Sequence, residues 1–141
     1  MGVHMLFDTH TSIRDGIHVG GLVSAENRGT KIPDTGFLCK FEKLDGYKIL
    51  ICHHPEYYPK YLSDKNIDII LSGHAHGGQW RIFGRGIYAP SQGIFPKYTS
   101  GIYDGKLIVS RGCGNYTRPI RVPRIFNPTE VLSIHITSDE K

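Results

Sequence analysis

Two apolar runs in the middle of the chain are separated by a polar segment. Residues 47–54 (YKILICHH) form an apolar, β-branched run of strand length that Pro55 ends, and residues 67–73 (IDIILSG) form a second run that ends at a glycine. Residues 56–65 between them predict a short helix or an irregular crossover. A strand, a crossover of about a dozen residues and a second strand make a βαβ unit with parallel strands. The pattern therefore predicts two buried parallel strands.

Shorter elements are predicted before this unit. Segments 3–7 and 17–23 have the apolar content of short strands. Apolar positions at helical spacing in residues 37–45 predict a helix, with Asp34 or Thr35 as its N-cap. The first third of the chain is thus expected to supply two strands and one helix.

The second half of the chain carries a hairpin signal and a final strand pattern. In residues 100–110, Asp104-Gly105 separates two strand-like runs, as a two-residue type I′ turn requires. Residues 130–136 alternate apolar and polar positions, which predicts a half-exposed strand. Mixed strands with a few crossover helices favour an α/β fold built on layered sheets.

Length and composition limit the classes of protein to consider. With 141 residues the chain holds one domain at most, and its 39% hydrophobic and 21% charged residues are an ordinary globular mixture. Cys39, Cys52 and Cys113 have no metal-type spacing and argue against a disulfide scaffold, which fits a reducing compartment. Because the chain as given shows no leader-like or membrane-spanning run, it is expected to be soluble and cytoplasmic.

The net charge of +4 favours anionic ligands, although a charge of this size also serves solubility alone. Such ligands include phosphate esters, nucleic acid and acidic lipid. A nucleic-acid-binding function would draw on the basic stretch from Arg111 to Arg124. That stretch is interrupted by prolines, and the sequence contains no recognition helix or RNA-binding aromatic motif. No specific nucleic-acid partner is therefore expected.

Histidine carries the candidate chemistry. Of the 8 histidines, His53-His54 and the pair His74 and His76 directly follow the two predicted parallel strands. Because the carboxyl ends of parallel strands meet at one edge of a sheet, roughly 5 Å apart for neighbours, the two clusters are expected to converge. Glycines around the second cluster (GHAHGGQ) allow the backbone to bend, so that both imidazoles can face one site. Neutral imidazole binds Zn, Mn, Fe or Ni, so these residues predict a metal site.

The other histidines, and the choice within the first cluster, have more ordinary interpretations. A single histidine is more often a hydrogen-bonded core or surface residue than a ligand, which is the interpretation for His4, His18 and His135. Adjacent side chains diverge, so only one of His53 and His54 is expected to bind metal directly. The residues alone leave open which one does.

The two histidine blocks resemble motifs of the calcineurin-like metallophosphoesterases. The family pattern runs D-x-H, G-D-x-x-D, G-N-H-[DE], a lone histidine and G-H-x-H; ILICHHPE resembles the fourth block and SGHAHGGQ matches the fifth. The following stretch, RIFGRGIYAPSQGIFPKYTSGIYDGKLIVSRGCGN, is similar to the bacterial phosphodiesterase subgroup of YaeI and YkuE, and the resemblance covers roughly residues 15–137. It implies an αββα fold, which is a layered β-sandwich flanked by helices. It also implies hydrolysis of a phosphodiester or phosphomonoester by a hydroxide that bridges two metal ions.

Carried onto this sequence, the resemblance implies metal ligands and substrate-binding residues. His53 and His74 would bind one of two divalent ions and His76 the other, with Mn, Zn, Fe or Mg as the metal. His53 rather than His54 matches the lone histidine of the family. Arg111, in the S-R-G block, would hold a phosphate oxygen, with a structural ion pair as the alternative. The other side chains expected to shape the substrate pocket are Gln79, Lys97 and Tyr98.

Two motifs of the family are missing from the sequence. There is no Gly-Asp and no Asn-His dipeptide, so the blocks that supply the bridging carboxylate and the asparagine ligand are absent. Asp8 and His10 do spell D-x-H, but we interpret this as a chance match because the motifs that should follow are not there. The chain is therefore expected to be the C-terminal portion of a single phosphoesterase domain, spanning residues 1–141. Its fold would be incomplete and its activity alone small.

A metal-binding or scaffold module without catalysis is the main alternative, and the missing acidic ligands favour it. If the hydrolase interpretation holds, the expected partner is a phosphate-ester small molecule or a lipid-linked substrate. Full-length members of the resembled subgroup often carry an N-terminal membrane anchor, so membrane association is expected for a longer protein of this kind.

Overall fold

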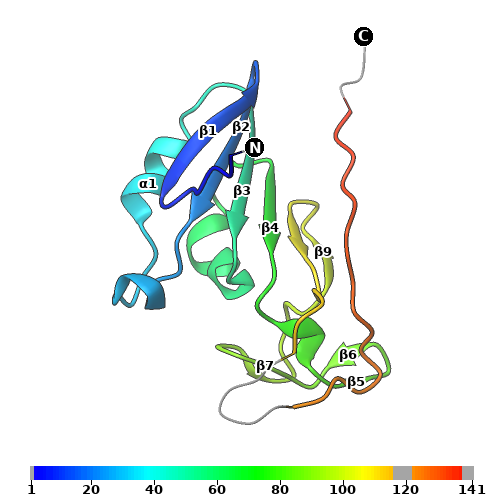
Figure 1. Cartoon of the computed structure of the whole chain (residues 1–141). Helices are drawn as coiled ribbons and strands as arrows, with labels where there is room; N and C mark the ends of the chain where they lie inside the picture. The colour runs from blue at the N-terminus through cyan, green and yellow to red at the C-terminus, as the bar shows by residue number, and fades with distance from the viewer. Residues whose placement is uncertain (1, 116–121, 138–141) are drawn as a thin grey trace.

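A six-stranded mixed sheet organises the structure, a computed structural model that describes residues 2–115 and 122–137 (Figure 1). The strands lie in the order β1-β2-β3-β4-β10-β9. β2, β3, β4 and β10 run parallel, whereas the outer strands β1 and β9 pair antiparallel with their neighbours. Their bounds are β1 Thr9–Arg14, β2 Ile17–Leu22, β3 Tyr47–Cys52, β4 Ile69–Ser72, β9 Gly101–Tyr103 and β10 Leu107–Val109.

Short helices and hairpins connect these strands. The helix α1 (Thr35–Phe41) begins after Asp34, whose side chain accepts a hydrogen bond from Phe37 N at 2.9 Å and so caps the helix. The crossover from β3 to β4 contains the 3-10 helix η2 (Pro55–Tyr57) and the π-helix η3 (Tyr58–Leu62). The remaining elements are η1 Glu26–Arg28, η4 His76–Gly78, β5 Arg81–Ile82, β6 Arg85–Gly86, β7 Tyr88–Ala89 and β8 Gly93–Ile94.

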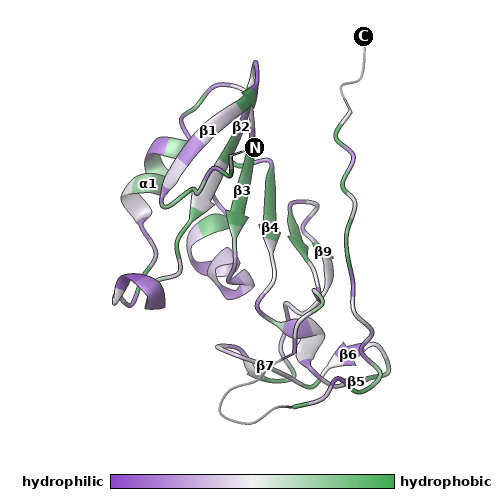
Figure 2. Ribbon diagram, viewed as in Figure 1, coloured by the Kyte–Doolittle hydropathy of each residue, from purple (hydrophilic) through white to green (hydrophobic). Residues whose placement is uncertain are grey.

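The hydrophobic core lies on the face of the sheet that α1 and η3 cover. Leu50 of β3, Ile70 of β4 and Leu107 of β10 are fully buried on this face. Figure 2 shows β3 and β4 as hydrophobic strands, whereas β1 is mostly polar. The next residue of β3, Ile51, points to the other face and is half exposed, as the two-residue period of a strand requires. The covering helices contribute Phe37, Leu38, Phe41, Tyr58 and Leu62.

Most of the predicted elements are confirmed, and so is the α/β class. β3 and β4 are parallel and joined by a short, irregular helical crossover. In the β9–β10 hairpin, Lys106 N donates to Tyr103 O at 3.0 Å, and Asp104 and Gly105 have φ values of 51° and 64°. Both values are positive, as a type I′ turn requires. Besides the six-stranded sheet, β5–β6 and β7–β8 each form a small two-stranded sheet.

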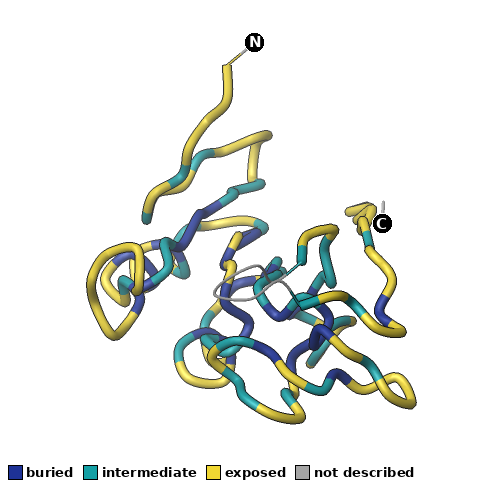
Figure 3. The backbone as a smooth tube through the Cα atoms, turned by 60° about the horizontal axis from the view of Figure 1, so that its bottom comes forward, coloured by how far each residue is buried: buried dark blue, intermediate teal, exposed yellow. Residues whose placement is uncertain are grey.

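Two predicted strands are wrong. Residues 3–7 form no strand and are largely exposed, as Figure 3 shows near the N-terminus; the polar residues 9–14 pair with β2 instead. Residues 130–136 are also assigned to no strand, although their polar and apolar positions alternate. A segment with an alternating pattern forms a strand only where it pairs with a neighbouring strand, and residues 130–136 pair with none of the described strands.

No helix in the described ranges has the length and apolar character needed to cross a membrane.

Candidate metal centre

The two histidine clusters lie beside one another at one edge of the sheet. β3 and β4 are neighbouring parallel strands, so the residues that follow them leave the sheet at the same edge. Gly73 N donates to His53 O at 3.2 Å and joins the two strand ends. The ring centroids of His53 and His74 are 5.0 Å apart, and those of His54 and His74 are 4.1 Å apart. The structure therefore brings together His53, His54 and His74, as the strand order predicted.

A carboxylate that the sequence analysis missed joins this cluster. Pro55 starts the 3-10 turn η2 directly after the histidines, and the turn holds Glu56 close to the end of β3. Glu56 Oε1 lies 2.8 Å from His54 Nδ1 and 4.0 Å from His74 Nε2. His54, Glu56 and His74 each offer one donor atom, and the three atoms lie within 4.8 Å of one another. This is the combination of imidazole and carboxylate donors that divalent metal sites use.

Two atoms of this group are buried without a hydrogen-bond partner. They are Glu56 Oε2 and His74 Nε2. A buried polar atom that lacks a partner costs roughly 1–3 kcal/mol, and such atoms are rare enough in proteins to call for a cause. A cation bound between the two side chains would satisfy both atoms, because each carries a lone pair. The residues present therefore fit a metal ion.

Burial lowers the pKa values of His53 and His74. Desolvation, followed by unfavourable electrostatic interaction with the neighbouring His54, lowers the pKa of His74 to about 4. Burial and the neighbouring His54 and His76 also lower the pKa of His53. Burial alone would raise the pKa of Glu56, but the hydrogen bond from His54 holds it below its ordinary value. At neutral pH His53 and His74 are thus neutral beside a carboxylate, and these are the protonation states that bind metal.

The loop that carries His74 and His76 has an unusual backbone. Both residues have positive φ values, 59° and 47°, and Gly77 and Gly78 follow at 67° and 79°. This backbone turns in place of continuing β4, as the glycine-rich sequence predicted. A Cβ atom on Gly78 would lie 2.3 Å from Gly86 Cα, so β6 packs directly against the loop. Non-glycine residues in the left-handed region are sparse, and they concentrate at functional sites.

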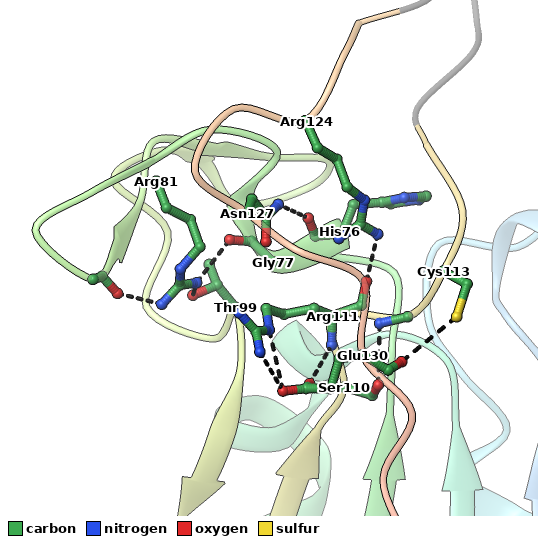
Figure 4. Close-up of polar contacts among 12 residues, drawn as sticks. His76, Gly77, Arg81, Thr99, Ser110, Arg111, Cys113, Arg124, Asn127 and Glu130 are labelled. Carbon is green, nitrogen blue, oxygen red and sulfur yellow. Dashed lines mark hydrogen bonds and ion pairs between the residues drawn. The ribbon is translucent and has the colours of Figure 1, made fainter.

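The C-terminal segment holds this loop in place (Figure 4). The buried Asn127 donates through Nδ2 to His76 O at 2.7 Å and to Gln79 O at 3.0 Å. From the other side, Arg81 Nη1 donates to Gly77 O at 2.8 Å. The position of His76 is therefore fixed by side chains up to 51 residues away in sequence.

His76 itself borders the cluster. Its Nδ1 lies 3.1 Å from Gly114 O, and electrostatic interaction with His76 is one of the causes that lower the pKa values of His53 and His74. Its role as a ligand, like the roles of His53 and His74, stays a prediction.

The predicted substrate-binding residues occupy three different surroundings. Arg111 forms an ion pair with Glu130 at 2.8 Å, and Glu130 also accepts from Arg111 N at 2.9 Å (Figure 4). Gln79 is buried beside the histidine loop. Tyr98 belongs to the hydrophobic core, where its ring meets Tyr103 at 4.9 Å between centroids. Lys97 Nζ lies over the ring of Tyr98 at 5.1 Å.

Asp8 and His10 have other partners. Asp8 accepts a hydrogen bond from Val23 N at 3.0 Å and forms an ion pair with Arg28. The ring of His10 lies near those of His18 and Phe41. No hydrogen bond, ion pair or ring contact among the described residues links Asp8 or His10 to the histidine cluster.

Comparisons with known proteins found three relatives that match part of this chain. The uncharacterized protein YpbG of Bacillus subtilis is 36% identical over 74 residues, 52% of this chain. F40B5.2 of Caenorhabditis elegans, named a putative metallophosphoesterase, is 31% identical over 97 residues, or 66% of this chain. Cj0846 of Campylobacter jejuni, named an uncharacterized metallophosphoesterase, is 32% identical over 127 residues, or 85% of this chain. The chain spans 26%, 20% and 31% of the lengths of these three relatives. No family model and no solved structure matches.

Proposed function

We propose that this chain supplies part of the metal centre of a phosphoesterase that hydrolyses a phosphodiester or phosphomonoester bond. The observation that carries the proposal is the meeting of three imidazoles and one carboxylate at the carboxyl ends of β3 and β4. Relatives named as metallophosphoesterases support the same reaction class. The downstream sequence motifs favour the YaeI- and YkuE-like phosphodiesterase subgroup within it.

The proposed centre holds two divalent ions. His54, Glu56 and His74 have donor atoms close enough to share one ion, and His53 and His76, which interact electrostatically with each other, would hold the second. The ligand set implied by the resemblance, His53, His74 and His76, is thereby extended by Glu56 and His54. When bound, such ions would neutralise charge on the phosphoryl oxygens and lower the pKa of a water molecule, so that it loses a proton and supplies the hydroxide that attacks phosphorus. Mn, Zn and Fe suit mixed imidazole and carboxylate donors, and Mg is the fourth metal that the resemblance allows.

The side chains of this chain have distinct tasks in the proposal. His74 stays neutral at physiological pH and keeps its lone pair available for a metal. Glu56 orients the His54 ring through their 2.8 Å contact, in the way that carboxylates next to ligand imidazoles fix the tautomer. Asn127 and Arg81 hold the loop of His76 so that its imidazole stays at the site. The net charge of +4 favours the approach of an anionic substrate.

The proposed substrate is a phosphate-ester small molecule or a lipid-linked phosphate, and a longer protein that contains this chain would act at or near a membrane if it carries an anchor. The described residues include one carboxylate within the cluster, and the two family motifs that carry further carboxylates are absent from the sequence. We therefore expect metal binding by the 141-residue chain, with weak hydrolysis or none.

Hydrolysis of bis(4-nitrophenyl) phosphate with added Mn²⁺ tests the proposal. The 141-residue chain and a version extended by the G-D-x-x-D and G-N-H-[DE] blocks of a relative should be assayed together with their His76→Ala variants. We expect turnover in the extended protein that chelation and His76→Ala both abolish, while His135→Ala, in the C-terminal segment, serves as control. Metal binding without turnover in the extended protein would favour the non-catalytic module. Absence of both would refute the proposal.

A further inference from the structure

Positive charge is concentrated in one segment of the chain. Residues 73–129 contain eight lysines and arginines but one acidic residue, Asp104, which gives the segment a net charge of +7. The whole chain has a net charge of +4, so its remainder is net negative. A charge asymmetry of this kind indicates a surface that meets an anionic partner, such as nucleic acid or a membrane.

Three of these cations meet in a pocket of about 390 Å³ beside the histidine loop. Arg81, Arg85 and Lys97 line the pocket, and no acidic side chain of the described residues does. Arg81 is fixed in place, because it donates to Gly77 O in the histidine loop and to Gly84 O in the β5–β6 turn (Figure 4). Arg85 and Lys97 are exposed, and none of the ion pairs in the described part of the chain involves them.

Exposed phenylalanines border this pocket. Phe95 lines it and is 72% exposed, and Phe83, next to the lining residue Gly84, is 100% exposed. Phe95 and Phe83 have positive φ values, 53° and 48°. Bulky residues rarely adopt this conformation, which glycine and asparagine adopt more easily. The chain thus holds two large apolar side chains in strained turns where they face solvent, and its own packing gives no reason for them.

Other exposed aromatic side chains lie in the same part of the structure. Backbone hydrogen bonds join the stretches that carry them, since Ile87 N donates to Trp80 O and Phe95 N donates to Ile87 O, both at 2.8 Å. Figure 1 shows β5, β6 and β7 together at the end of the molecule away from α1. Contiguous exposed apolar groups mark interaction surfaces. Among the described residues, five of the six large exposed aromatic side chains belong to this segment: Trp80, Phe83, Tyr88, Phe95 and Phe126.

The chemistry of this surface favours a lipid bilayer over nucleic acid. Nucleic-acid sites stack bases on aromatic rings along a basic groove. Phe83 instead lies at the tip of the β5–β6 hairpin with its whole side chain in solvent. Aliphatic side chains flank both phenylalanines, because Ile82 is 54% and Ile94 72% exposed. Apolar side chains beside unpaired cations complement the acyl boundary and the anionic headgroups of a membrane.

We propose that this part of the chain docks on a lipid bilayer that contains anionic phospholipids. The docking surface consists of Arg81, Phe83, Arg85, Phe95 and Lys97. Its two phenylalanines would enter the boundary between headgroups and acyl chains, and its three cations would contact lipid phosphates. The docking surface belongs to this chain, so it needs no anchor from a longer protein. It also depends on neither the metal centre nor the proposed hydrolysis.

Co-sedimentation of the 141-residue chain with lipid vesicles tests the proposal. Vesicles of phosphatidylcholine alone should be compared with vesicles of equal parts phosphatidylcholine and phosphatidylglycerol. A chelator should be present, so that no metal ion links the histidines to lipid phosphate. We expect binding to the anionic vesicles that weakens as the salt concentration rises, and little binding to the neutral vesicles.

Two variants with matched controls locate the surface. Phe83→Asn should weaken binding about 10- to 100-fold, because burial of a phenylalanine is lost, and Arg85→Gln should weaken it about 5-fold. Asparagine tolerates the positive φ at residue 83, so this variant should fold as the unmodified chain does. The controls Phe7→Asn and Arg14→Gln remove an exposed phenylalanine and an exposed arginine near the N-terminus, and they should bind as the unmodified chain does.

Several results would overturn the proposal. Absence of binding to the anionic vesicles, or equal binding to both kinds of vesicle, would contradict docking on anionic lipid. Equal losses in Phe83→Asn and Phe7→Asn would place any binding elsewhere on the chain. Saturable binding of a single-stranded oligonucleotide, with none to vesicles, would assign the surface to nucleic acid. Binding of glycerol phosphate in solution, with none to vesicles, would assign the pocket to free phosphate esters.

Discussion

Acidification should destabilise the folded chain through His74. Burial beside other imidazoles lowers the pKa of this side chain to about 4, from an ordinary value of 6.5. Between pH 4 and pH 6.5 the His74 imidazole is therefore protonated in the unfolded chain but neutral in the folded chain. Linkage then requires the free energy of unfolding to fall as the pH drops from about 6.5 toward 4.

The size of the effect follows from the two pKa values. One pKa unit corresponds to about 1.4 kcal/mol, so the complete transition costs roughly 3 kcal/mol, and roughly 2 kcal/mol of it is already lost at pH 5. His53 adds to the loss with the same sign, because its pKa is lowered too. Carboxylates with lowered pKa values, such as Glu130, contribute only below about pH 4.5, the ordinary value for glutamate. Between pH 6.5 and pH 5 the loss of unfolding free energy therefore comes from the histidines and not from these carboxylates.

Urea unfolding between pH 7 and 5, with a chelator present, measures this loss. The matched variant is His74→Asn, since asparagine tolerates the positive φ of 59° at this position. We expect the unfolding free energy of the unmodified chain to fall by about 2 kcal/mol over this interval, and that of the variant to fall distinctly less. Parallel pH profiles for the two proteins would refute the account of a buried, neutral imidazole.

Three further predictions concern the support of the site. Asn127→Ala removes two hydrogen bonds to the histidine loop and should cost about 1–3 kcal/mol in thermal or urea unfolding; no loss of stability would contradict the role assigned to it. Gly78→Ala places a Cβ 2.3 Å from Gly86 Cα and should lower the free energy of unfolding, measured in urea, by more than about 2 kcal/mol. The control Gly84→Ala has a similar φ but open space around the new Cβ, so its loss should be about 1 kcal/mol. Equal losses in the two variants would argue against close packing of β6 on the loop. Glu130→Gln should lower stability by about 1 kcal/mol at low salt and less at high salt, because it weakens a partly exposed ion pair; a salt-independent loss would show that the charge is not responsible.

The parts of the fold that local patterns specify were predictable. Apolar runs bounded by proline and glycine gave β3 and β4, Asp34 marked the start of α1, and Asp-Gly marked the hairpin turn. The strand errors have one physical cause. Whether an alternating segment becomes a strand depends on a partner that the segment itself does not contain, so polar β1 was missed while residues 130–136 were assigned a strand.

The candidate site likewise has features that local sequence predicted and features that depend on tertiary contacts. The meeting of the two histidine clusters followed from parallel strand order alone. Glu56 was missed because its approach depends on the tight turn after Pro55, although the sequence H-H-P-E contained the signal. Asn127 could not be found, since its contact with the loop joins residues 51 positions apart. The docking surface likewise depends on tertiary packing that brings Phe95 and Lys97 to the β5–β6 turn.

Calorimetric titration with Zn²⁺ tests the central claim most directly. The unmodified chain should bind, and His74→Asn should abolish measurable binding. Glu56→Gln should weaken binding by at least about 10- to 100-fold, because the site loses a charged ligand and the carboxylate that orients the His54 ring. Glu42→Gln, in an ion pair with Lys65 on the protein surface, provides the matched control and should bind as the unmodified chain does. Equal Zn²⁺ affinity in the unmodified chain and in His74→Asn would contradict a metal centre at the ends of β3 and β4.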